Sequence, residues 1–139
     1  MSRYLLDTDT FSLYLQHNPI VFGAVLRHLS DHVTISVITI QEVWDGWAAV
    51  IAKAKTPDQV AAAYSRLTDT LNELMNWPVI SFSAGAVVRY AALKKQKLNV
   101  GSNDLKIAAI AIETGATAVT HNGRDFSRIP GVTIEDWAI

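Results

Sequence analysis

The sequence predicts an α/β fold in which helices flank a mainly parallel β-sheet of about five strands, with residues 1–139 in a single domain. Short β-branched runs alternate with longer segments whose apolar residues recur at helical spacing. These longer segments can provide the helical crossovers that parallel strands require. Half of the residues are hydrophobic and 18% are charged, which excludes intrinsic disorder and supplies enough apolar surface for a core.

The N-terminal half begins with a buried strand at Tyr4–Leu6. Asn18-Pro19 favours the start of a helix that continues to Leu29, because Asn is a good cap and Pro is tolerated in the first turn. Val33–Val37 is rich in β-branched residues and indicates the second strand. Over Thr39–Ile51 the apolar side chains fall on one helical face, which predicts a long helix.

The rest of the chain continues the alternation. Thr56-Pro57 opens a helix that extends to about Met75, and Ser83 caps the next helix. Another helix is predicted over Ser102–Glu113, with Gly115 as its C-terminal stop. Three further strands are predicted: Pro78–Ser81, Thr117–Thr120 and a short one at Val132–Ile134.

The composition excludes several classes of site. The chain has no cysteine, and therefore no disulfide, thiolate metal site or cysteine nucleophile, which is compatible with the cytoplasm. Its net charge of −1 excludes a nucleic-acid binder that depends on bulk positive charge. No histidine pair has zinc-ligand spacing, and no serine-hydrolase elbow or P-loop is present. We also expect no signal peptide and no membrane-spanning segment.

Four acidic residues stand at loop or helix-start positions next to the predicted strands. Asp7 follows the first strand and Glu42 follows the second. Asp104 opens the helix that precedes the fourth strand, and Asp125 lies in the loop after that strand. Ligands of α/β proteins gather beyond the carboxyl ends of parallel strands. We therefore expect these four carboxylates to reach the same edge of the sheet.

Acidic residues in these positions also have structural interpretations. Asp9 is expected to cap the first helix. Glu42 completes a capping box with Thr39, which makes a cap as good an interpretation of this residue as a ligand. Asp125 would simply pair with a neighbouring arginine on the surface.

Asp104 favours a functional interpretation. Its neighbours on the helical wheel are apolar: Ile107, Ala108 and Ala111. A carboxylate at the head of a buried stripe is costly unless a cation compensates it, and converging carboxylates raise one another's pKa. Mg²⁺ and Mn²⁺ prefer oxygen ligands, so an all-carboxylate site in a cysteine-free α/β protein indicates phosphoryl chemistry.

Five segments, in this order and spacing, carry a resemblance to a known family: Tyr4–Asp9, Ile35–Val43, Gly101–Ala109, Val119–Phe126 and Ile129–Trp137. They resemble the PIN domain, and within it the VapC-type toxins of bacterial toxin–antitoxin pairs. The resemblance covers the whole chain.

The resemblance implies a three-layer PIN-like fold and a Mg²⁺- or Mn²⁺-dependent endoribonuclease that hydrolyses RNA with metal-activated water. Asp7, Glu42 and Asp104 match the first three acids of the family motif. The fourth position corresponds to Asn122 or to Asp125, and Asp125 is the candidate in this chain. The resemblance also implies a cytoplasmic toxin, a cognate VapB-like antitoxin that blocks the site, and a homodimer.

Contacts with RNA or protein partners are expected at a few places. Because the chain is not basic, RNA contacts depend on local cations, for which the candidates are Lys94, Lys95, Lys97, Lys106 and Arg124. The lysine run 94–97 is alternatively a solvated helix end. The apolar helical faces over 40–51 and 60–74 carry Trp44 and Trp47, and we expect an antitoxin segment or a second copy to cover part of this surface.

Two other functions stay open at this point. Asp7–Phe11 also resembles the opening motif of haloacid-dehalogenase-type phosphatases, in which Asp7 would be the nucleophile and Asp9 an acid/base. No later paired-acid motif and no cap insertion supports that interpretation. A non-catalytic binding module with the PIN fold is the other alternative, and the presence of all four acids argues against it.

Overall fold

The computed structural model describes all 139 residues and contains a five-stranded sheet in the order β3-β2-β1-β4-β5. Every pair of neighbouring strands is parallel, as predicted. The strands are β1 (Arg3–Leu6), β2 (His32–Ser36), β3 (Val79–Ile80), β4 (Thr117–Val119) and β5 (Ile134–Glu135).

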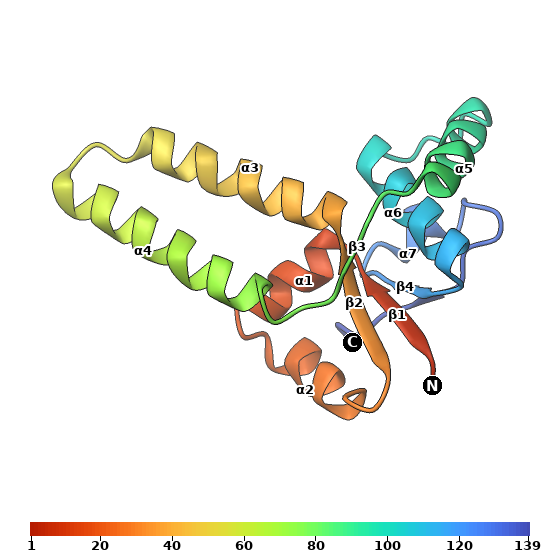
Figure 1. Ribbon diagram of the computed structural model, residues 1–139, viewed down its shortest axis with the longest axis horizontal. Coiled ribbons are helices and arrows are strands. Elements are labelled where there is room, and N and C mark those ends of the chain that lie inside the picture. Colours follow the sequence, from red (N-terminus) through yellow and green to blue (C-terminus); the bar gives the residue numbers. More distant parts are fainter.

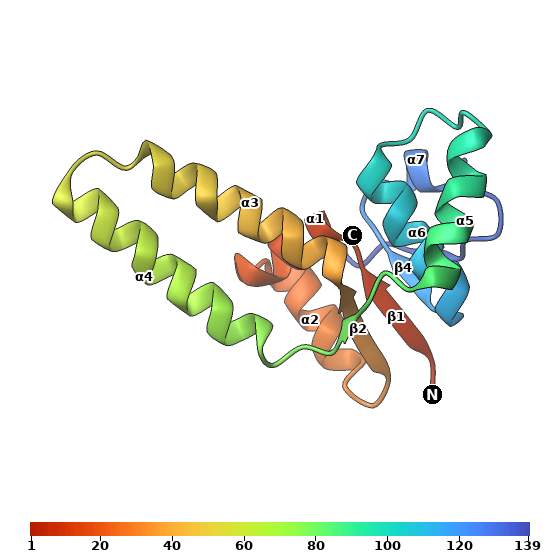
Figure 2. The ribbon, with the colours of Figure 1, turned by 45° about the horizontal axis from the view of Figure 1, so that its top comes forward.

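Helices cover both faces of this sheet, so the fold has three layers (Figures 1 and 2). α1 to α4 lie on one side, and α5 and α6 lie on the other. The helices are α1 (Thr8–Leu15), α2 (Pro19–Arg27), α3 (Val37–Lys53), α4 (Pro57–Leu74), α5 (Ala84–Lys95), α6 (Ser102–Thr114) and α7 (Gly123–Phe126). None of them combines the length and the apolar character that crossing a membrane would need.

The alternating side chains of β1 divide the core into two clusters. Leu5 packs with the buried residues of α6 and with Phe126 on one face of the sheet. Tyr4 and Leu6 pack on the other face, together with Phe11 of α1. This is the period-two alternation of a strand that is buried on both faces, as the central strand of a parallel sheet is.

α3 and α4 form a hairpin that projects beyond the sheet (Figures 1 and 2). Ala63 is the one buried residue of α4. Trp44 on α3 remains 54% exposed, and Tyr64 on α4 is exposed as well. The small core therefore does not absorb the apolar faces of these two helices, as the sequence predicted.

The predicted start of α3 at Thr39 is wrong. The helix begins at Val37, because the Ser36 hydroxyl caps it by accepting the Thr39 N–H at 3.3 Å. The second strand consequently ends at Ser36, before Val37. Glu42 then lies in the second turn of the helix, too far along to form a capping box with the chain before it.

The predicted cap of the first helix is also wrong. Asp7 caps α1, since its carboxylate accepts the Thr10 N–H at 2.9 Å, and Asp9 lies inside the first turn. Two smaller corrections concern the C-terminal region. Asp125 lies in the short helix α7 rather than in a loop, and the last strand is Ile134–Glu135 because it pairs in register with the end of β4.

Candidate active site

The pairing of the three central strands aligns their carboxyl ends at one edge of the site. Leu6 of β1 pairs with Ile35 of β2 on one side and with Val119 of β4 on the other. The next residue of each strand therefore emerges at the same level: Asp7, Ser36 and Thr120. All three are buried, and the Asp7 N–H extends the ladder by donating to the Val119 carbonyl at 2.9 Å.

Asp7 is held rigidly at this edge. Its side chain is tied to the first turn of α1 through the Thr10 N–H, and the whole residue is 3% exposed. Burial raises the pKa of the Asp7 carboxyl, while the nearby Thr120 hydroxyl and the Thr10 backbone N–H oppose this rise. The hydrogen bonds around Asp7 thus offset the cost of burying its charged form only in part.

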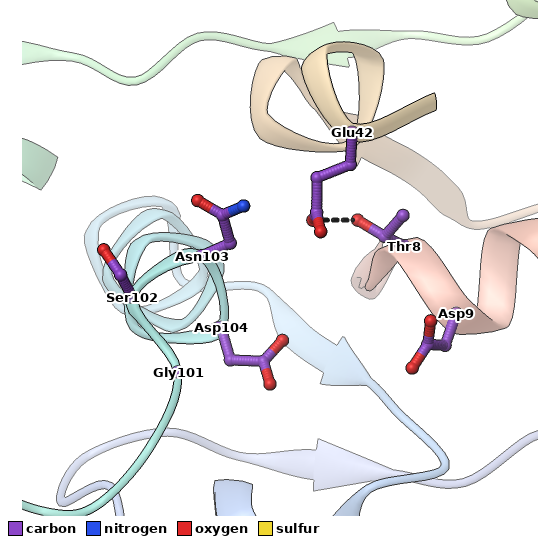
Figure 3. Close-up of a pocket in the computed structure, with 7 residues that line it drawn as sticks. All are labelled: Thr8, Asp9, Glu42, Gly101, Ser102, Asn103 and Asp104. Carbon is purple, nitrogen blue, oxygen red and sulfur yellow. Dashed lines mark hydrogen bonds between the residues drawn. The ribbon is translucent and has the colours of Figure 1, made fainter. Parts of the chain in front are cut away.

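Glu42 reaches the same region from the second turn of α3. Its carboxylate accepts a hydrogen bond from the Thr8 hydroxyl at 2.7 Å (Figure 3). The Thr8 hydroxyl also lies 3.0 Å from that of Thr39. Because Thr8 has a single hydroxyl proton and gives it to Glu42, Thr39 is the donor in the second contact. This relay joins α1 to α3 and fixes the orientation of Glu42.

Asp104 points into the same space from the first turn of α6 (Figure 3). It is half-buried and makes no hydrogen bond or ion pair within the chain. Desolvation raises the pKa of Asp104 to about 6, and four neighbouring negative charges add to the effect: Asp7, Asp9, Glu42 and Asp125. The prediction that Asp104 stands at the head of the buried face of α6 is confirmed, and no group of the chain compensates its charge.

A pocket of about 400 Å³ opens between these helices, and none of the residues that line it is hydrophobic. Its lining consists of Thr8, Asp9, Glu42, Gly101, Ser102, Asn103 and Asp104 (Figure 3). The N-cap residue of α6, Gly101, has no side chain to cap the helix, so the first N–H groups of α6 lack a side-chain acceptor. The pocket is therefore polar throughout and rich in carboxylate oxygen.

Asp125 lies beside this pocket rather than in its lining. The Asn122 side chain donates to it at 2.9 Å, and Arg128 donates to its other oxygen at 3.3 Å. The surface pairing with an arginine that the sequence left open is therefore present. Asp125 nevertheless adds to the negative potential at Asp104. Asn122 and Asp125 are direct neighbours, so both candidates for the fourth position occupy one place in the fold.

Sequence reasoning gave no site role to five of the pocket-lining residues: Thr8, Asp9, Gly101, Ser102 and Asn103. Two of them, Thr8 and Asp9, come from the first turn of α1. The carboxylate of Asp9 points into the space that Asp104 also faces (Figure 3). The position of Asp7 could have revealed them. If Asp7 is the N-cap of α1, then Asp9 is the second residue of that helix and cannot be its cap. Thr8 then follows Asp7 directly, at the point where α1 meets α3.

The donor set suits a hard divalent cation. Every ionisable side chain that lines the pocket is a carboxylate, and the other side-chain donors are hydroxyl and amide oxygens. Mg²⁺ and Mn²⁺ prefer such ligands, whereas histidine and cysteine, which zinc and copper favour, are absent from the lining. No three acidic or histidine side chains stand close enough to form a closed ligand group on their own. The acids surround an open space instead.

Comparison with known proteins places this geometry in a family. The model of the PIN domain family matches residues 4–132. The chain belongs to the PIN domain family. It is 34% identical to Ribonuclease VapC2 of Rickettsia felis over 96% of this chain and 97% of that protein. It is 30% identical to the tRNA(fMet)-specific endonuclease VapC of Salmonella typhimurium over 99% of both chains.

Solved structures of VapC relatives agree with this PIN fold. The DNA-bound VapBC of Salmonella typhimurium contains a chain that matches with a TM-score of 0.74 at 27% identity over 99% of both chains. The VapBC2 of Rickettsia felis, bound to a DNA fragment from the promoter, matches with a TM-score of 0.73 at 28% identity over 96% of this chain and 98% of that chain. The family match spans nearly the whole chain and favours the ribonuclease interpretation over the phosphatase one.

Proposed function

We propose that this PIN domain protein is a Mg²⁺- or Mn²⁺-dependent endoribonuclease that acts as the toxin of a toxin–antitoxin pair. One observation carries the proposal: Asp104, without any partner in the chain, lies in a wholly polar pocket where its partial burial, and then the charges of four other acids, raise its pKa. Relatives that match over almost the full length are named ribonucleases or endonucleases. An acidic pocket at a parallel sheet edge and a ribonuclease family point to the same chemistry.

Asp7, Glu42 and Asp104 would hold the cation directly or through water. Glu42 and Asp104 line the pocket, while Asp7 lies outside its lining but close enough for its charge to act on Asp104. A bound divalent cation supplies acidification of water and stabilisation of the negative charge that develops on the leaving oxygen. The chain contributes orientation: the Thr8 hydroxyl fixes Glu42, and the Thr10 N–H fixes Asp7. With its pKa at about 6, Asp104 is ionised near neutral pH and available as a ligand.

Asp125 has a supporting role in this proposal. Its two oxygens already accept hydrogen bonds from Asn122 and Arg128, so it is less free than Asp104 to change partners. We assign it to a second cation or to the water molecules of the first. The haloacid-dehalogenase alternative would instead require Asp7 as a nucleophile, yet Asp7 is buried and serves as a helix cap.

We propose an antitoxin as the protein partner and a second copy of the chain as a dimer partner. Several relatives of known structure come from VapBC assemblies. In this chain, Trp44 and Tyr64 leave an apolar surface on the α3–α4 hairpin that the protein itself does not cover.

The decisive experiment is RNA cleavage by purified protein freed from its partner. Because one relative is named a tRNA(fMet)-specific endonuclease, initiator tRNA is the first substrate, followed by total RNA. We expect cleavage with Mg²⁺ or Mn²⁺, none with EDTA, and 5′-phosphate and 3′-hydroxyl ends. Products with 2′,3′-cyclic phosphate would refute hydrolysis by activated water, because they require attack by the RNA's own 2′-hydroxyl. No cleavage of any RNA would favour the non-catalytic binding module.

A further inference from the structure

Two lysines from different helices converge on one tyrosine beside the acidic pocket. The Nζ atom of Lys94 on α5 lies 5.9 Å from the centre of the Tyr90 ring. The Nζ atom of Lys106 on α6 lies 5.6 Å from the same point. Both ammonium groups therefore lie near one tyrosine ring, where α5 and α6 pack together.

A hydrogen bond connects this cluster to the rim of the pocket. The Tyr90 hydroxyl lies 2.9 Å from the Ser102 hydroxyl, and Ser102 is one of the pocket-lining residues. On α6, Ser102 and Lys106 are four residues apart and share a face, as Tyr90 and Lys94 do on α5. Figure 3 shows Ser102 and Asp104 leaving the first turn of α6 on opposite sides. The lysine cluster is thus adjacent to the acidic pocket but separate from it.

Neither lysine has an acidic partner. Nearby arginines are neutralised, since Arg89 pairs with Glu113 and Arg128 pairs with Asp125. Lys94 and Lys106 form no salt bridge. Both ammonium groups are therefore free to pair with an anion from outside the chain.

The surroundings of Tyr90 show the same concentration of positive charge. Its hydrogen bond with Ser102 lowers the pKa of the Tyr90 hydroxyl, and the charges of Lys94 and Lys106 lower it further. Hydroxyl and ammonium donors on one surface match the oxygen atoms of a phosphate group.

We propose that Tyr90, Lys94, Ser102 and Lys106 form a phosphate-binding subsite that holds the RNA backbone next to the acidic pocket. This inference rests on the proposed function, because it assumes an RNA chain that passes the pocket. A polyanion is repelled by five clustered carboxylates, and the chain as a whole carries a net charge of −1. Local cations beside the pocket must therefore supply the attraction, and unpaired ones are available here.

The test compares two double variants that remove the same charge. Lys94→Gln/Lys106→Gln removes the ammonium groups of the subsite. Lys53→Gln/Lys55→Gln removes two lysines near the distant tip of the α3–α4 hairpin and serves as the control (Figure 1). Binding of a fluorescent oligoribonucleotide is measured by anisotropy in EDTA, at several salt concentrations between about 50 and 200 mM.

We expect the subsite variant to bind RNA about fivefold more weakly at low salt, and its plot of log K against log salt to flatten by about 0.7, the value of one phosphate contact on a single strand. In the cleavage assay with Mn²⁺, its KM should rise while kcat stays close to wild type. The control variant should behave as wild type in both assays. Lys94→Arg/Lys106→Arg should restore binding, which separates lost charge from lost structure.

Equal affinity and equal salt dependence of the two Gln double variants would overturn the subsite. That result is distinct from failure of the proposed function. If wild type does not cleave RNA at all, the nuclease assignment fails, while the anisotropy measurement in EDTA still decides whether Lys94 and Lys106 bind a phosphate backbone.

Discussion

Asp104→Asn tests whether the acids of the pocket form one electrostatic unit. The substitution keeps the size and shape of the side chain and removes one negative charge. It breaks no internal hydrogen bond, because Asp104 makes none. The structural cost is then limited to the lost interaction of a carboxylate with the N-terminus of α6, about 0.3–1 kcal/mol.

The gain follows from the pKa of Asp104. A rise from 3.8 to about 6 corresponds to an upper limit of about 3 kcal/mol at about 1.4 kcal/mol per pKa unit. Because Asp104 is only half-buried, solvent screening reduces this penalty to roughly 1–2 kcal/mol. Removing the charge should therefore leave the free energy of unfolding in EDTA equal to that of wild type or about 1 kcal/mol higher near pH 7.

The same raised pKa predicts how the free energy of unfolding changes with pH. An acid whose pKa is raised in the folded protein binds more protons folded than unfolded, so its contribution to stability is fully present below pH 3.8 and is lost as pH rises through about 6. Wild type should thus lose stability relative to Asp104→Asn across this window. Above it the difference should be constant.

Thermal melts of both proteins across this pH range, with EDTA and with Mn²⁺, provide the assay. Mn²⁺ at about 100 times its Kd should stabilise wild type by about 2.7 kcal/mol and shift the variant much less. The variant should also lose RNA cleavage. A variant that is less stable than wild type in EDTA, keeps the full Mn²⁺ shift and still cleaves RNA would refute the reasoning, since Asp104 would then be a purely structural residue.

Three further outcomes follow from contacts of the site. Thr8→Val removes the donor to Glu42 and should weaken Mn²⁺ binding about tenfold in calorimetry, with an unchanged affinity counting against its orienting role. Ser36→Ala removes the cap of α3 and should lower the free energy of unfolding by about 1 kcal/mol in urea titrations, whereas a smaller loss would leave the cap unimportant. Asp9→Asn should lower the pKa of Asp104 in carbon-detected NMR titrations without unfolding α1, and an unmoved pKa would remove Asp9 from the cluster.

Much of the fold could be predicted because its signals are local. Asn18, Thr56 and Ser83 cap the helices that the sequence assigned to them, and each cap accepts backbone N–H groups of its own first turn. Gly115 ends α6 with a φ of 70°, the left-handed conformation that glycine adopts without strain. The parallel sheet followed from the alternation of strands and helices. Each of these features depends on a few neighbouring residues.

The wrong predictions concern the starts of α1 and α3, where the sequence offers two suitable cap residues for each helix. Asp7 and Asp9 are both acceptable caps two residues apart, and the choice depends on where β1 ends, which the pairing with β2 and β4 decides. Likewise Ser36 and Thr39 are both good cap residues, and the β-branched run around them suits a strand or a helix start. Tertiary pairing selected Asp7 and Ser36, and no local pattern contains that information.

The electrostatics of the pocket depend on the same pairing of β1 with β2 and β4. When β1 ends at Leu6, Asp7 becomes the cap and is buried, and Asp9 turns toward the space that Asp104 faces. Thr8, between them, then meets Glu42 across the gap from α1 to α3. Sequence motifs identified four separate acids, whereas the end of this strand also brings a fifth acid, Asp9, and an orienting hydroxyl to the opening that the half-buried Asp104 faces. That surplus of negative charge makes a cation in the pocket favourable and requires positive charge on its rim before an RNA chain can approach.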